Sequence, residues 1–91
     1  MRHLHAVVRI EKKTKRAILF YRCTDGNGLE CYTLEEQHSA AVQEYYNDDT
    51  RPAGSDVERT LCAALARHYA TRLKLYDDIE LKVGARLPFK S

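Results

Sequence analysis

The stretch RAILFYRCTDGNGLECYTL, residues 16–34, decides the fold of this chain. Its first half is rich in branched and aromatic residues, and its second half again favours a strand. Between the halves, Asp25-Gly26-Asn27-Gly28 contains Asp-Gly and Asn-Gly pairs, which supply the positive φ angles of tight hairpin turns. The stretch therefore predicts an antiparallel hairpin, with strands over 16–23 and 29–34.

A further strand is predicted upstream of this hairpin. Residues 4–10 alternate between apolar and other side chains with period two, and the connection over 11–15 is only long enough for a hairpin loop. Pairing Ile10 with Ala17 sets the register and gives the sheet one wholly apolar face. The opposite face is mixed, so it needs a cover, either more of this chain or another subunit.

Two helices are predicted next, and the first covers roughly 35–46. It opens with Glu35-Glu36, because acidic residues suit the positive end of a helix dipole. Residues suited to packing then recur at helical spacing and give the helix one packing face. They are Leu34, His38, Ala41, Val42, Tyr45 and Tyr46. The pattern ends at Asn47-Asp48-Asp49.

The second helix is predicted to begin at Ser55 and to run to about Tyr76. Ser55 and Glu58 form a capping-box pattern, in which each side chain satisfies an orphan backbone amide. The face expected to pack on the sheet consists of Val57, Leu61, Ala64, Leu65, Tyr69, Leu75 and Tyr76. The face expected to meet solvent carries Asp56, Arg59, Ala63, Arg67, Ala70 and Lys74.

The last predicted element is a strand over Ile79–Val83, which alternates apolar and charged residues. The sequence therefore predicts a single small α+β domain over 1–91, in the order β-β-β-α-α-β. Its sheet has three meandering antiparallel strands plus the C-terminal strand, and both helices pack on one face. A chain of 91 residues suffices for one such core.

Composition and cysteine content favour a cytosolic protein. The chain is 44% apolar and 31% charged, as globular domains are. Its apolar runs are far shorter than the roughly 18 residues of a membrane span, and no apolar signal segment follows Met1. Cys23, Cys31 and Cys62 make an odd number, which argues for reduced thiols. A Cys23–Cys31 disulfide is the alternative.

No metal, cofactor or small-molecule ligand is expected, because the cysteines and histidines lack the pair spacing of zinc sites. Segment 25–36 fails as a calcium loop, since Glu30 stands where that loop needs glycine. His68, Arg72 and Tyr76 are candidates for a pocket or an anion site, unless Arg72 extends along the helix into solvent. We predict no enzyme, because His68 has no nucleophile beside it in the helical pattern.

Charged residues are sorted into blocks along the chain. Residues 1–22 hold seven basic residues and one acid, 23–50 hold seven acids without Lys or Arg, and 51–91 hold eight basic residues and five acids. A net charge of +2 thus hides local nets of +6, −7 and +3. Such asymmetry bears on partners and self-association more than on fold.

The basic block coincides with the first predicted hairpin. A protruding ribbon with lysines at its tip suits phosphate contacts, and Tyr21 could stack on a base. The residues expected to contact nucleic acid or a partner are Arg9, Lys12, Lys13, Lys15, Arg16, Tyr21 and Arg22. Lysines on exposed strands also prevent edge aggregation, a role that needs no ligand.

We therefore predict a small cytosolic, non-enzymatic interaction domain that self-associates as a homodimer. The mixed second face of the sheet, the six tyrosines and the complementary charged blocks favour this function. Its association is expected to weaken with salt. The alternative is binding to the nucleic-acid backbone through the basic hairpin 9–22. No membrane partner is expected.

Overall fold

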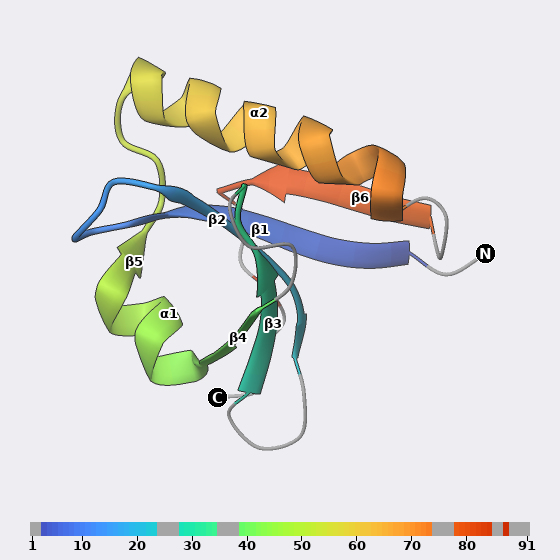
Figure 1. The fold of residues 1–91 in the computed structure, drawn as a ribbon, viewed down its shortest axis with the longest axis horizontal. Coiled ribbons are helices and arrows are strands. Elements are labelled where there is room, and N and C mark those ends of the chain that lie inside the picture. The colour runs from blue at the N-terminus through green and yellow to red at the C-terminus, as the bar shows by residue number, and fades with distance from the viewer. Residues whose placement is uncertain (1–2, 24–27, 35–38, 74–77, 85–86, 88–91) are drawn as a thin grey trace.

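The computed structural model describes residues 3–23, 28–34, 39–73, 78–84 and 87. Within these residues the chain forms an α+β fold with two helices and a six-stranded sheet (Figure 1). The strands are β1 (His3–Glu11), β2 (Ala17–Cys23), β3 (Gly28–Tyr32), β4 (Ser39–Val42), β5 (Thr50–Arg51) and β6 (Asp78–Val83). The helices are α1 (Gln43–Asp49) and α2 (Asp56–Leu73). The predicted α+β class is confirmed.

The sheet is mixed and has two strands more than the sequence predicted. Its order is β4-β3-β2-β1-β5, and β6 also pairs with β1. Neighbouring strands are antiparallel except for β6, which runs parallel to β1. The chain between β1 and β6 holds all the other elements, and α2, which links β5 to β6, runs along the sheet (Figure 1).

The register of the first hairpin is the predicted one, with Ile10 opposite Ala17 and Arg9 opposite Ile18. The next pair, β2 and β3, places Cys31 opposite Phe20 rather than opposite Cys23. The two cysteines therefore do not face each other across the ladder, and both are free thiols, as Cys62 is.

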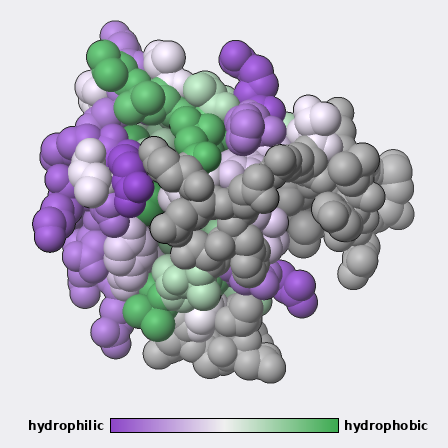
Figure 2. Space-filling model, in the orientation of Figure 1, coloured by the Kyte–Doolittle hydropathy of each residue, from purple (hydrophilic) through white to green (hydrophobic). Residues whose placement is uncertain are grey.

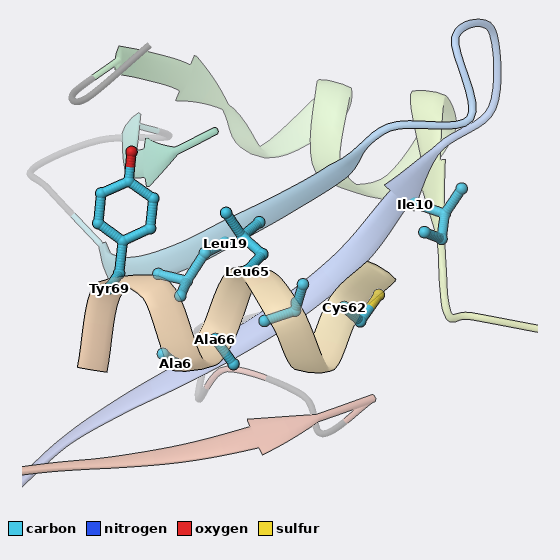
Figure 3. Close-up of a cluster of buried hydrophobic side chains, with 8 residues drawn as sticks. Ala6, Ile10, Leu19, Cys62, Leu65, Ala66 and Tyr69 are labelled. Atoms are coloured by element: carbon cyan, nitrogen blue, oxygen red, sulfur yellow. The ribbon is translucent and has the colours of Figure 1, made fainter. Parts of the chain in front are cut away.

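One face of the sheet packs against α2. The apolar residues of β1 and β2 on this face meet one side of the helix and form a buried cluster (Figure 3). The cluster consists of Ala6, Val8, Ile10, Leu19, Cys62, Leu65, Ala66 and Tyr69. The wholly apolar face that the register predicted is therefore the face that the longer helix covers.

The opposite face packs against α1, so the prediction that both helices share one face is wrong. Val7, Ile18, Phe20, Leu29 and Cys31 point to this side and enclose Tyr46 of α1, together with Leu87. Phe20 lies edge-on to Tyr46, with ring centroids 5.0 Å apart. The mixed face does need a cover, and a segment of the same chain provides one.

The first predicted helix is wrong in its N-terminal half. Within the described residues, 39–42 form β4, which pairs with β3 through Leu29 and Ala41, and only Gln43–Asp49 is helical. Val42 precedes the helix in an extended conformation and makes no side-chain cap. Residues 35–38 lie outside the description. Pairing with an edge strand outweighs a helical pattern here, because it satisfies the backbone of both strands at once.

Candidate functional site

The outer face of α2 is an unexpected feature of the surface that the structure describes. Val57 and Leu61, which were predicted to pack on the sheet, are 71% and 41% exposed, and Ala64 is exposed as well. Figure 2 shows hydrophobic surface above the N-terminal part of this helix. The packing face of α2 is instead centred on Cys62, Leu65, Ala66 and Tyr69. The prediction for Leu65 and Tyr69 is confirmed, that for Val57, Leu61 and Ala64 is wrong, and Leu75 and Tyr76 lie outside the described residues.

The angular positions of the apolar residues around α2 explain why the wrong face was expected to pack. The apolar arc predicted from the sequence stretches from Ala64 to Tyr69 and is about 140° wide at 100° per residue, whereas the arc actually buried stretches from Leu65 to Ala66 and is about 100° wide. Because Cys62 and Ala66 are small, they allow α2 to lie close to β1 and β2 and rotate the packing face toward themselves. Their small size is the signal that could have revealed the rotation.

The start of α2 is fixed by an ion pair and a cap. Arg51 of β5 donates two hydrogen bonds to the Glu58 carboxylate, one of them 2.7 Å long. Ser55 Oγ accepts from the Glu58 amide at 3.2 Å, while the Glu58 carboxylate accepts from the Gly54 amide at 2.9 Å. The hydrogen bonds from Arg51, and then the one from Gly54, lower the pKa of Glu58 to about 2. The predicted capping box is thus present, with Gly54 as the amide that Glu58 satisfies.

The tip of the basic hairpin is a tight connection between β1 and β2. The Glu11 amide donates to the Arg16 carbonyl at 2.8 Å, and the Lys15 amide donates to the Glu11 carbonyl at 2.8 Å. Lys15 has a φ of 62°, a left-handed conformation that costs a residue with a side chain about 1–2 kcal/mol. The Lys12 amide donates to the Asp49 carbonyl at 2.9 Å and ties the tip to the end of α1.

The predicted basic contact residues fall into two groups. The lysines at the tip, Lys12, Lys13 and Lys15, are exposed, and their side chains form no ion pair or hydrogen bond with the described residues. The three arginines all have acidic or polar partners, described next. The structure therefore brings together a compact triplet of charges rather than the seven-residue surface that the sequence predicted.

Arg9 lies against α1 and β5, where its guanidinium donates to Thr50 Oγ1 and to the Thr50 carbonyl, both at 2.8 Å, and covers the Tyr46 ring at 4.2 Å. Arg16 lies 3.6 Å from the Glu11 carboxylate, and Arg22 lies 3.8 Å from that of Glu30. These three charges thus lie beside partners within the chain.

Glu11 is the one acidic residue of the basic hairpin, and its carboxylate has several partners. It accepts hydrogen bonds from the hydroxyls of Thr14 and Tyr45 and pairs with Arg16. The hydrogen bond from the Thr14 hydroxyl lowers the pKa of Glu11 most. The hydrogen bond from the Tyr45 hydroxyl and the charge of Arg16 lower it further. Burial raises the pKa of Tyr45 most, and its hydrogen bond to Glu11 raises it further. This network holds α1 against the base of the hairpin.

Tyr21 stands in an aromatic stack rather than alone. Its ring lies 5.0 Å from that of Tyr32, and Tyr32 lies 4.6 Å from Tyr69 of α2, with both pairs nearly parallel. The pairing of β2 with β3 shifts register between Phe20 and Arg22, at Tyr21. One face of Tyr21 is thereby occupied by its own chain, which weakens its case as a platform for a base.

The candidate pocket of His68, Arg72 and Tyr76 is described only in part. His68 is exposed on α2, with its ring perpendicular to that of Tyr69 at 4.8 Å. Arg72 lies in the last turn of α2 without a described side chain, and Tyr76 lies outside the described residues. Of the three residues, the structure thus places only the His68 side chain.

A groove of about 390 Å³ lies elsewhere, on the α1 side of the sheet. Its walls are mostly apolar and come from β2, β3, β4 and α1, with Arg16, Thr33 and Tyr45 as its polar groups. The charged residue among these walls, Arg16, lies 3.6 Å from the Glu11 carboxylate outside the groove, so its charge is already partly balanced within the chain.

Within the described residues, no group of three or more His, Cys, Asp or Glu side chains is arranged to hold a metal ion. The described helices also lack the combination of length and apolar character that crossing a bilayer requires. Comparison with known protein families, with curated proteins and with solved structures finds no significant match to this chain. The candidate function therefore depends on the surfaces described above.

Proposed function

We propose that the protein is a non-enzymatic interaction domain that self-associates, and that it works in the cytosol. The supporting observation is the apolar outer face of α2, where Val57 and Leu61 stay exposed although the helix already packs on the sheet with its other side. A helix that is apolar on two sides is typical of an element with two packing partners. The three free thiols favour a reducing compartment.

Two features that led to this function from sequence have contacts within the chain. The mixed face of the sheet is covered by α1, and the acidic and basic blocks meet at the ion pair between Arg22 and Glu30. The proposal therefore rests on α2 rather than on the sheet or on the charged blocks.

Sedimentation velocity at low salt tests the proposal. We expect the wild-type protein to form dimers at tens of micromolar, and Leu61→Asp to be monomeric there, because a buried unpaired carboxylate costs several kcal/mol. Val83→Asp is the matched control, since Val83 lies on β6 and is exposed to nearly the same degree, 42% against 41%. A wild-type protein that is monomeric under these conditions would contradict self-association.

The second candidate function is binding to the nucleic-acid backbone, and the conformation of Lys15 favours it. A left-handed residue is most cheaply glycine, yet this position carries a charge beside two other free lysines. Lys15→Gly should therefore raise the free energy of unfolding by about 1 kcal/mol while weakening binding to a short DNA duplex. Each lost phosphate contact should reduce the salt slope of log affinity by about 0.9.

Lys82→Glu on β6 is the control for this second candidate, because Lys82 is also exposed but lies outside the hairpin. Fluorescence anisotropy over a salt series gives the slopes. If Lys12, Lys13 and Lys15 are all changed to Glu and binding falls no more than it does for Lys82→Glu, the hairpin tip does not contact the backbone.

A further inference from the structure

We propose that the outer face of α2 binds the same face of a second copy of the protein, with the two helices antiparallel. This inference rests on the proposed self-association and names its surface and its geometry. The apolar face consists of Val57, Leu61 and Ala64, with the exposed His68 at its C-terminal end. At 100° per residue these four positions lie within an arc of about 60°, which is narrow enough to form one straight contact line along the helix.

The charges beside this line favour a second copy as the partner. Asp56 at the start of α2, which also pairs with Arg59 one turn along the helix, and Arg67 near its end are both exposed and lie on the same flank of the line, about 20° apart around the axis. A two-fold axis perpendicular to two antiparallel helices places each flank against the same flank of the other subunit. Asp56 then meets Arg67 of the partner subunit, and the symmetry forms this pair twice.

A parallel arrangement would not have this complementarity. It would place the two Asp56 carboxylates at the same end of the contact, while Glu58 in the same turn is already paired with Arg51. Like charges at an interface are unfavourable, and the positive ends of the two helix dipoles would also adjoin. The antiparallel arrangement instead sets each acidic first turn against the C-terminal half of the other helix, where Arg67 lies.

The spacing of the two charges fixes the centre of the contact. The midpoint between Asp56 and Arg67 falls beside Leu61, so Leu61 packs against its counterpart across the two-fold axis. Val57 then enters the gap between Ala64 and His68 of the partner subunit, which is the knobs-into-holes arrangement of paired helices. The contact involves one face of one helix, so its area falls below the standard interface range of about 1,200–2,000 Å². We expect a weak, concentration-dependent dimer.

Cysteine cross-linking distinguishes the two arrangements. In a Cys23→Ser background, which removes the exposed native thiol, Leu61→Cys should form an intersubunit disulfide under mild oxidation. Val57→Cys is the matched control, because Val57 is the more exposed of the two. In the antiparallel pair its two copies lie about 13 Å apart along the axis, too far to link. Equal cross-linking of both variants would indicate a parallel pair and overturn the inference.

Charge reversal gives an independent readout. Asp56→Arg and Arg67→Asp should each weaken the dimer about fivefold, because each variant places like charges together twice. The double variant should restore much of the wild-type affinity, because it exchanges the two partners, although it leaves the introduced arginine beside Arg59. Circular dichroism checks that α2 remains folded in all three variants. Absence of rescue in the double variant would contradict the Asp56–Arg67 contact.

The results separate this inference from the proposed function. A wild-type protein that stays monomeric at all concentrations overturns both. A wild-type dimer in which Leu61→Cys does not cross-link and charge reversal has no effect overturns only the α2 arrangement, and self-association through another surface survives.

Discussion

The two sides of the sheet differ in how the chain covers them. On one side the short helix α1 buries Tyr46, and the polar groups around it are bonded to the chain, with Arg9 over the Tyr46 ring and on Thr50. On the other side the much longer α2 buries one face and leaves Val57 and Leu61 exposed. The side with the smaller cover is thus the one held by more polar contacts, although a groove remains between β4 and α1.

This difference shows that the length of a helix does not determine how much of it the core uses. The α1 side is held by specific polar contacts around a single aromatic residue, whereas the α2 side has an apolar core and a second apolar surface on the outer face of the helix. Interaction is therefore expected from the α2 side, and the α1 side is expected to contribute stability. Three changes test this division of roles.

The largest effect is expected from two leucines on the same helix. Leu65 is fully buried against β1 and β2, so Leu65→Ala should lower the free energy of unfolding by about 3 kcal/mol. Leu61 is partly exposed, and Leu61→Ala should change the free energy of unfolding by less than about 1 kcal/mol. Urea denaturation at a concentration where the protein is monomeric measures both. Equal losses would mean that the outer face of α2 belongs to the core.

A smaller effect is expected from Arg9 on the α1 side. Arg9→Lys keeps the charge but cannot make both hydrogen bonds to Thr50 while covering the Tyr46 ring. We expect it to lower the free energy of unfolding by about 2 kcal/mol. Arg22→Lys is the control, because Arg22 makes an exposed ion pair at 3.8 Å. This variant should lower the free energy of unfolding by only about 0.5 kcal/mol. Equal losses in urea denaturation would show that Arg9 is not a structural residue.

The sequence predicted those elements whose signals are local. The turn after Cys23, the alternation that pairs Ile10 with Ala17 and the cap at Ser55 depend on residues close together in the chain, and the register and the cap appear in the structure. The turn itself lies outside the described residues. Long-range features were missed. The pairing of β4 with β3 and the placement of α1 behind the sheet depend on residues far apart in sequence.

The candidate surface was missed for a related reason. The apolar residues of α2 were visible in the sequence, but which of them face the sheet depends on how closely Cys62 and Ala66 let the helix approach, and this is a property of packing. The arginines of the hairpin were likewise recognised as charges, while their partners Thr50 and Glu30 come from other parts of the chain.

The smallest effect concerns the ion pair between Arg51 of β5 and Glu58 of α2, which joins the sheet to the start of the helix. The folded pKa of Glu58, about 2, lies below its ordinary value of 4.5. Its ionised form therefore stabilises the fold fully above pH 4.5, and this contribution is lost as the pH falls from 4.5 toward 2. The difference in free energy of unfolding between wild type and Glu58→Gln should be largest near neutral pH and should shrink through that window.

The matched background for this last prediction is Arg51→Gln, because the hydrogen bonds from Arg51 are the largest cause of the lowered pKa. In that background Glu58→Gln should show a much flatter pH dependence, with the Gly54 amide as the remaining local donor. Urea denaturation from pH 2 to pH 7 measures all four proteins. An unchanged pH dependence in the Arg51→Gln background would show that the two sides of the sheet are not linked by this ion pair, and that the start of α2 is held by its cap alone.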